Sequence, residues 1–326
     1  MPQVLNREAI YNFLLDSIDD RVSIEGFAYE PIKLGGMYWS LTAIALLKGK
    51  INDIVHPKAN KTLESMAIEI LERAKNSNGA FGFAPKHSSN LIATHYGILV
   101  LGLLDKLELL DREGIIEFIA NLQNKDGSFS ADQFGEADCR HSYSAIVCLH
   151  ILNGLDKIDL SSAISFILSC KNFDGGFGWQ PKTESHAAAA FCCIGALSVL
   201  EAVYLVDRDK LGFWLAERQT KSGGFNGRPE KAPDICYSWW ILSALCNIDR
   251  VEWICGEKLI EFILESQNEN DGGIAFFPGY MGDICHTFFA LCGIALINNK
   301  EYNLQPVHPI YATTMETANR LLKYQS

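Results

Sequence analysis

The sequence predicts an all-α protein in which six helix pairs form a closed ring around an apolar cavity. Short glycine-containing turns recur along the chain, and their first glycines are Gly79, Gly127, Gly175, Gly223 and Gly272. The steps between them are 48, 48, 48 and 49 residues. A fixed period of this size is typical of a repeated supersecondary unit, and it is long enough for two helices and their connections.

The inner helices of the ring are predicted by strongly apolar segments, one after each glycine turn. These segments are HYGILVLGLL (95–104), HSYSAIVCLHIL (141–152), HAAAAFCCIGAL (186–197), CYSWWILSAL (236–245) and CHTFFALCGIAL (285–296). The segment YWSLTAIALL (38–47) supplies a sixth without a preceding turn. Because such helices have almost no polar face, we expect them to be buried.

The outer helices are predicted by amphipathic segments between the apolar ones. Examples are LGFWLAERQ (211–219) and GEKLIEFILESQ (256–267), in which apolar residues recur at three- and four-residue spacing. If inner and outer helices alternate around a ring, all inner helices point the same way. Their N-termini then share one rim, and we expect a functional site at this rim.

Three acids occupy equivalent helix starts. Asp138, Asp234 and Asp283 each lie 11 residues after the first glycine of their turn. An Asp at a helix N-terminus satisfies free N–H groups and suits the helix dipole, and this capping role is sufficient for Asp138 and Asp283. Asp234 differs, because Cys236 lies two residues further on and His286 occupies the same rim one repeat later.

Asp234, Cys236 and His286 together offer an oxygen, a sulfur and a nitrogen donor, a combination that zinc accepts. Three protein ligands would leave a fourth position of a tetrahedral zinc open, which is a catalytic arrangement. A substrate thiol in that position would be a thiolate near neutral pH. Next to this site, a cationic pocket of His186, Arg228, Lys231 and Tyr237 would stabilise a departing diphosphate.

Aromatic side chains of the inner helices are predicted to line the cavity, which would suit an isoprenoid chain. The alternative is that they only fill the core. These residues are Trp39, Tyr96, Tyr143, Phe191, Trp239, Trp240 and Phe288.

Composition favours one continuous domain over residues 1–326, because 48% of the residues are hydrophobic and no linker interrupts the chain. The net charge of −11 argues against nucleic acid as a partner. The apolar runs are interrupted too often to span a membrane, and no N-terminal signal pattern is visible, so we expect a cytoplasmic protein. Most of the ten cysteines lie inside apolar helical segments, where reduced, buried thiols are the simpler interpretation.

In its motifs the chain resembles the β subunits of protein prenyltransferases over nearly its whole length, most of all the Rab geranylgeranyltransferase (type II) group. The segments that carry this resemblance are NFDGGFG followed by ESHA, GGFNGRPEKAPDICYSWW and DICH. The early YWSLTAIALL and the late PVHPIY also resemble type II chains.

The resemblance implies an α/α toroid that holds one Zn²⁺ through Asp234, Cys236 and His286. It implies a diphosphate pocket of His186, Arg228, Lys231 and Tyr237, and catalytic roles for Lys231 and Tyr237. It also implies a heterodimer with a prenyltransferase α subunit, which transfers geranylgeranyl from geranylgeranyl diphosphate to cysteines of Rab GTPases that a Rab escort protein presents. Among the cavity residues it includes Arg140, for which a salt bridge to Asp138 or Glu136 is the alternative, and Trp239 and Trp240.

The chain departs from the family pattern in places that concern isoprenoid length and magnesium. Gly35 falls at a position that sets the length of the isoprenoid pocket, and the missing side chain favours the longer geranylgeranyl group. His95 falls at a second such position, usually aliphatic in type II chains, and a hydrogen-bonded core histidine is the alternative there. Phe276 replaces the Asp or Lys of the relatives, so we expect Mg²⁺ to contribute little through this position.

Other functions remain open at this point. Within the family these are a type I geranylgeranyltransferase, which acts on CaaX sequences, or a farnesyltransferase β subunit. Outside it, terpene cyclases share the ring but need a DxDD motif that is absent here, and thioester domains need a Gln where this chain has Lys258. A non-catalytic ring with structural zinc is the last alternative.

Overall fold

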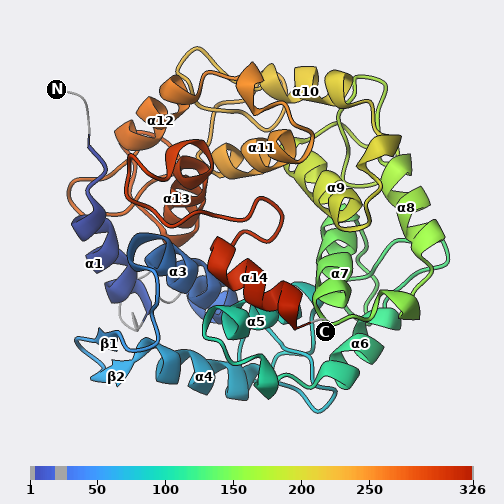
Figure 1. Cartoon of the computed structure of the whole chain (residues 1–326), viewed down its shortest axis with the longest axis horizontal. Helices are drawn as coiled ribbons and strands as arrows, with labels where there is room; N and C mark the ends of the chain where they lie inside the picture. Colours follow the sequence, from blue (N-terminus) through green and yellow to red (C-terminus); the bar gives the residue numbers. More distant parts are fainter. Residues whose placement is uncertain (1–3, 19–27, 325–326) are drawn as a thin grey trace.

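The computed structural model describes residues 4–18 and 28–324, which form a ring of paired helices (Figure 1). Six inner helices among these residues pack side by side around the centre, and α13 packs against α3 to close the ring. The inner helices are α3 (Lys33–Lys48), α5 (Leu91–Leu103), α7 (Cys139–Ile151), α9 (Ala187–Val199), α11 (Cys236–Asn247) and α13 (Ile284–Asn298). The predicted all-α toroid is confirmed.

The outer helices lie behind the inner ones and bury one face against them. In α12, for example, Leu259, Phe262 and Ile263 are buried while the charged residues face outward. α1 lies between α13 and α3 and contacts both, so it completes the outer layer. The outer helices are α1 (Arg7–Ile18), α4 (Leu63–Ala74), α6 (Arg112–Ala120), α8 (Leu160–Ser169), α10 (Arg208–Ala216) and α12 (Gly256–Glu265).

The glycine turns hold each repeat against the next outer helix. Gly223 has a φ of 91°, and a Cβ there would lie 2.1 Å from the carbonyl oxygen of Lys258 in the first turn of α12. Both the backbone conformation and the close approach require glycine at this position. Gly272 packs in the same way against Ala9 of α1. The last of these turns therefore packs on α1, and this contact completes the outer layer of the ring.

The N-terminal ends of the inner helices are tied to one rim by backbone hydrogen bonds. The N–H of Ala187 donates to the carbonyl of Gly227 at 2.8 Å, and that of Ile235 donates to Phe276 at 3.0 Å. Equivalent bonds join Leu34 to Phe83, Leu91 to Ala131 and Cys139 to Trp179. Each bond places the loop of one repeat beside the helix start of the preceding one, so residues from neighbouring repeats meet at the rim.

The opposite end of the ring is closed by the segment that precedes α14 (Met315–Lys323). Tyr38 donates to the carbonyl of Ala312 at 2.7 Å, while Tyr143 and Ser243 donate to those of Ile310 and Pro309. Three inner helices therefore hold this segment as a floor.

Short elements complete the chain. They are the antiparallel pair β1 (Val55–His56) and β2 (Lys61–Thr62) and the 3₁₀ turns η1 (Glu30–Ile32), η2 (Leu107–Leu109), η3 (Leu155–Lys157), η4 (Val203–Leu205) and η5 (Val251–Trp253). In the part of the chain that the structure describes, no helix combines the length and apolar character that a membrane crossing requires.

Candidate active site

Polar residues at equivalent positions lie at the starts of the inner helices α5, α7, α9, α11 and α13 at the rim. Asn90, Asp138, His186 and Asp283 each accept a hydrogen bond from an N–H of the first helical turn. Asp234, at the same position of its repeat, accepts from the N–H of Cys236 at 2.8 Å. The capping interpretation of Asp138 and Asp283 is confirmed, and the site is built on this row of helix starts.

The three predicted metal ligands come together from two repeats. The donor atoms of Asp234, Cys236 and His286 all lie within 4.8 Å of one another. His286 Nε2 is 3.4 Å from Asp234 Oδ1, and the Cys236 side chain is almost fully buried beside them. Proteins hold zinc with donor sets of this kind.

Asp283 fixes the orientation of His286. Its Oδ2 accepts a hydrogen bond from Nδ1 of the imidazole, and its Oδ1 accepts the backbone N–H of His286 at 2.9 Å. Tyr29 donates to the same Oδ1 at 3.5 Å. Because Nδ1 is held in this way, Nε2 points at Asp234. In metal sites a carboxylate commonly orients a histidine ligand by the same kind of hydrogen bond.

The electrostatics of the cluster favour a positive charge. Burial lowers the pKa of His286, but the hydrogen bonds and charges of Asp234 and Asp283 outweigh burial and raise it to about 10. The neighbouring thiol of Cys285, burial and both carboxylates raise the pKa of Cys236 well above its usual value. A divalent cation between the three donors would offset the carboxylate charge and stabilise the thiolate. The residues present therefore fit a zinc ion.

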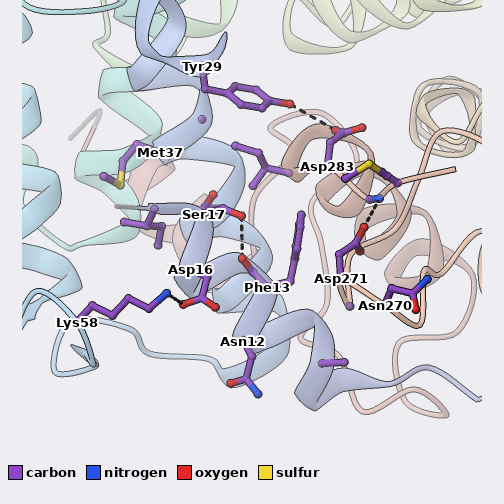
Figure 2. Close-up of a pocket in the computed structure, with 18 of the residues that line it drawn as sticks. Asn12, Phe13, Asp16, Ser17, Tyr29, Met37, Lys58, Asn270, Asp271 and Asp283 are labelled. Atoms are coloured by element: carbon purple, nitrogen blue, oxygen red, sulfur yellow. Dashed lines mark hydrogen bonds and ion pairs between the residues drawn. The ribbon is translucent and has the colours of Figure 1, made fainter. Parts of the chain in front are cut away.

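A hollow of about 590 Å³ also borders Asp283, between α1, α3 and the loop before α13 (Figure 2). Asp16, Lys58 and Asp271 are among its charged lining residues, and Tyr29 reaches Asp283 from its side. Neither Cys236 nor His286 is among the described residues that line it. The three donors line neither this hollow nor the aromatic cavity described below, but Cys285, the chain neighbour of His286, lines the aromatic cavity.

A polar pocket lies next to the three candidate metal ligands, at the starts of α9 and α11. The Tyr237 hydroxyl is 3.3 Å from Nε2 of His186, whose Nδ1 accepts the N–H of Ala188. Gly227 makes this contact possible, because a Cβ there would lie 2.3 Å from Cζ of Tyr237. The tyrosine ring therefore packs directly on the backbone of the loop that carries Arg228.

Of the two basic side chains of this pocket, one is paired with a carboxylate and the other is not. Arg228 forms an ion pair with Glu184, and the exposed Lys231 has no ion-pair partner among the described residues. Burial and the charge of Arg228 lower the pKa of His186, while burial, Asp234 and Cys236 raise that of Tyr237 to about 12. Near neutral pH the hydroxyl is therefore protonated and can donate to an anion.

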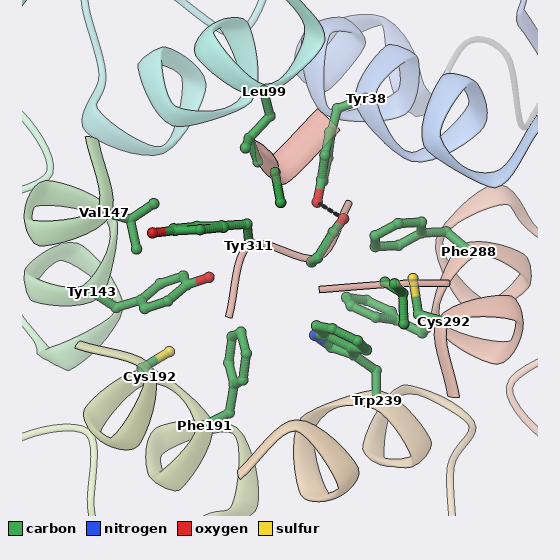
Figure 3. Close-up of a cluster of buried hydrophobic side chains, with 14 of the residues drawn as sticks. Tyr38, Leu99, Tyr143, Val147, Phe191, Cys192, Trp239, Phe288, Cys292 and Tyr311 are labelled. Atoms are coloured by element: carbon green, nitrogen blue, oxygen red, sulfur yellow. Dashed lines mark hydrogen bonds between the residues drawn. The ribbon is translucent and has the colours of Figure 1, made fainter. Parts of the chain in front are cut away.

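The centre of the ring contains an aromatic cavity of about 240 Å³. All seven aromatic residues predicted for the cavity line it, and so do His95 and Arg140. Figure 3 shows how Tyr143, Phe191, Trp239 and Phe288 surround the floor residue Tyr311.

Gly35 does not lie among the residues that line the cavity. A Cβ on Gly35 would meet Tyr96 at 3.3 Å and Trp39 at 3.6 Å. These two rings already occupy the space that the missing side chain was expected to open, so the longer chain finds no extra room beside Gly35.

Both interpretations of Arg140 hold at once. Its Nη2 lies 2.6 Å from Asp138 Oδ2 and 3.3 Å from Glu136 Oε1, and the guanidinium lines the cavity beside Trp179 at 5.2 Å from the ring centre. The ion pairs position Arg140 at the cavity mouth.

Several residues of the site were not predicted from the sequence. Trp179 lies between Arg140 and His186, with its ring 5.1 Å from the imidazole, and Tyr29 and Glu184 hold Asp283 and Arg228. Tyr311 closes the cavity from a distant segment. The repeat register could have indicated Trp179, because Phe276 occupies the equivalent place beside His286.

Comparison with known proteins agrees with this fold. Residues 5–313 match the model of the prenyltransferase alpha-alpha toroid domain. The chain therefore belongs to the prenyltransferase α-α toroid family.

Particular relatives are similar to different extents. A probable geranylgeranyl transferase type-2 subunit beta from Dictyostelium discoideum is 44% identical over 55 residues, which are 17% of this chain and 16% of that relative's length. The structure is similar to that of Candida albicans protein geranylgeranyltransferase-I complexed with GGPP, with a TM-score of 0.88 and 24% identity over 99% of this chain and 100% of that one. A type II terpene cyclase from Scytonema shares the fold at a TM-score of 0.59 and 12% identity, over 91% of this chain and 98% of that one.

Proposed function

We propose that this chain is the catalytic β subunit of a Rab geranylgeranyltransferase, which transfers geranylgeranyl from geranylgeranyl diphosphate to C-terminal cysteine thiols of Rab GTPases. The observation that carries the proposal is the meeting of three parts at one rim. The donor set of Asp234, Cys236 and His286 lies beside the polar pocket of His186 and Tyr237, and both adjoin an aromatic cavity.

Each part has a role in the proposed transfer. Zn²⁺ held by Asp234, Cys236 and His286 would keep the substrate cysteine as a thiolate near neutral pH. The sulfur attacks C1 of the isoprenoid, the bond from C1 to oxygen breaks, and the diphosphate departs with the electron pair.

The residues of the pocket and cavity act on the isoprenoid diphosphate. His186, Tyr237, Arg228 and Lys231 bind the departing anion by charge and hydrogen bonds. Trp239 and Trp240, with the other aromatic residues of the cavity, hold the isoprenoid chain and exclude water.

The partners follow from the same proposal. The β subunit pairs with a prenyltransferase α subunit, and a Rab escort protein presents the Rab substrate. The similarity to a type-2 subunit and the GRPEKAPDICYSWW segment support the Rab type. The likeness to a geranylgeranyltransferase-I structure keeps a CaaX-specific type I enzyme as the second candidate.

Magnesium is proposed to contribute little at the metal site. Phe276 lies on the rim with its ring 6.0 Å from that of His286 and 4.5 Å from that of Tyr280. The Phe276 side chain has no oxygen to offer Mg²⁺, which prefers carboxylate and water oxygens.

Two experiments test the proposed function. Elemental analysis should find about one zinc per wild-type chain and none in His286→Ala, as expected for a site with three protein ligands. A well-folded wild type without zinc would favour the alternative function, a non-catalytic binding ring.

The second experiment separates the Rab type from type I. The chain is coexpressed with an α subunit and offered either a Rab protein with its escort protein or a free CaaX peptide. Prenylation of the Rab alone supports the Rab type, whereas efficient prenylation of the free peptide excludes it.

A further inference from the structure

Three apolar side chains are exposed at the rim, in the loop that leads to α13. Phe276 is 37% exposed, Tyr280 is 55% exposed and Met281, the next residue, is 67% exposed. The rings of Phe276 and Tyr280 pack on each other with their centres 4.5 Å apart, and the ring of Phe276 lies 6.0 Å from that of His286. We call these three residues the rim patch. Neighbouring apolar side chains that stay exposed often mark a binding surface.

Backbone hydrogen bonds hold the rim patch in place. The carbonyl of Phe276 accepts the N–H of Ile235 at 3.0 Å, which ties the patch to the residue before Cys236. The carbonyl of Tyr280 accepts the side-chain amide of Asn268 at 2.8 Å. The exposed rings are therefore fixed beside the two helix starts that carry the candidate metal ligands.

The rim patch is not part of the wall of the aromatic cavity. Phe276, Tyr280 and Met281 are absent from the described residues that line this cavity, whereas Trp179, at the place equivalent to Phe276, does line it. The patch therefore does not serve the isoprenoid chain inside the ring. Its position beside His286 and its exposure direct it toward the other reactant, which approaches the rim from solvent.

The proposed function fixes which part of that reactant passes the rim patch. A C-terminal cysteine reacts with its sulfur next to His286, so the rest of the substrate extends from the site on the N-terminal side of this cysteine and leaves the rim toward solvent. One residue of an extended chain spans about 3.5 Å. The side chain that precedes the cysteine can therefore reach Phe276, 6.0 Å from His286.

We propose that the rim patch binds an apolar side chain at the residue that precedes the reactive cysteine of the substrate. The proposal rests on the proposed function and adds a sequence preference to it. An apolar side chain removes the exposed rings and the Met281 side chain from water together with itself, which is favourable. A polar side chain gains little, because the patch offers a single hydroxyl, that of Tyr280, as a hydrogen-bond partner.

The test uses the chain coexpressed with an α subunit and two Rab substrates that differ only in the residue before the reactive cysteine. One carries Leu there and the other Asn, which is neutral and similar in shape. Both compete, with escort protein, for geranylgeranyl diphosphate, and the ratio of the products gives the ratio of their kcat/KM values. The wild type should prefer Leu about ten-fold, the scale of burying one apolar side chain. Tyr280→Ser/Met281→Ser should remove most of this preference.

A binding measurement separates recognition from transfer. Fluorescent peptides with the same Leu or Asn before a terminal cysteine should show the same preference in fluorescence anisotropy, without isoprenoid diphosphate. Phe134→Ser is the matched control. Phe134 is 78% exposed in the loop before α7, which lies opposite α13 in the ring, so its removal should leave the preference for Leu unchanged.

The outcomes that overturn the proposal differ from those that overturn the proposed function. Equal transfer to both Rab substrates by the wild type, or an unchanged preference in Tyr280→Ser/Met281→Ser, refutes the role of the rim patch and leaves the proposed function intact. Loss of the α subunit from this double variant also refutes it, because the patch is then covered by that subunit. Failure of a well-folded wild-type heterodimer to prenylate either Rab refutes the proposed function, and the substrate contact with it.

Discussion

Asp138 and Asp234 occupy the same position in two repeats, yet they have different partners. Asp138 caps α7 and forms an ion pair with Arg140 two residues further on, at 2.6 Å. Asp234 has Cys236 at the equivalent place, and its carboxylate faces the thiol and His286. The repeat therefore places a carboxylate at each of these helix starts, and the residue two positions later decides what the carboxylate does.

Asp283 is the third member of this set and has a third role. It caps α13 and at the same time accepts from Nδ1 of His286. Asp138 is neutralised by a guanidinium, Asp283 orients a ligand, and Asp234 is itself a ligand candidate. The same capping position thus carries a residue of a structural ion pair, a residue that supports His286 and a candidate metal donor.

The largest expected effect comes from removing the residue that distinguishes the Asp234 start. Cys236→Ala deletes the sulfur donor, and two remaining ligands should not retain zinc. We expect zinc to fall from about one per chain to none, and prenyl transfer to be abolished. Elemental analysis and a single-turnover transfer assay measure both.

The matched control for Cys236→Ala is Cys292→Ala, which removes a buried thiol of α13 outside the donor set. This variant should keep its zinc and its turnover. Zinc and full activity in Cys236→Ala would contradict the assignment of the site.

The next effect concerns the orienting role of Asp283. Asp283→Asn keeps a good helix cap but replaces the carboxylate that accepts from His286. Loss of such an outer acceptor typically weakens metal affinity about 10- to 100-fold. Competition with a zinc chelator measures this change, and Asp138→Asn is the control with the same substitution at the equivalent helix start. Equal zinc affinity in the two variants would show that Asp283 is only a cap.

A smaller effect is expected in the neighbouring pocket. Arg228→Ala should weaken binding of isoprenoid diphosphate by about 1.5 kcal/mol, the lower end for hydrogen bonds to charged groups, because its side chain is 40% exposed and also paired with Glu184. Glu184→Ala is the converse test, since it frees the guanidinium and should not weaken binding. Weaker binding in Glu184→Ala would mean that the ion pair positions Arg228 for the ligand.

The fold could be predicted because the repeat encodes it locally. The glycine spacing and the apolar segments give the helix pairs, and the equivalence of Asp138, Asp234 and Asp283 follows from the same register. The meeting of Asp234, Cys236 and His286 was also predictable, because all inner helices begin at one rim.

The parts that could not be predicted depend on contacts between distant segments. The space beside Gly35 is filled by Tyr96 from the next inner helix, and the floor is Tyr311 from the segment before α14. The direction in which a side chain points, rather than the spacing of residues along the chain, decides which ring fills the space beside Gly35 and which residue forms the floor. A period of 48 residues indicates which helices are neighbours but not which rings turn into the shared space.

The smallest expected effect tests the purely structural member of the set. Asp138→Ala removes the cap of α7 and the partner of Arg140, and loss of such a cap costs about 1 kcal/mol of unfolding free energy. Urea denaturation measures the loss, while zinc content should stay at the wild-type value. Asp138 is not one of the three candidate ligands, so loss of zinc in Asp138→Ala would show that the helix starts are coupled around the rim. Unchanged zinc would show that each repeat specialises its own carboxylate independently.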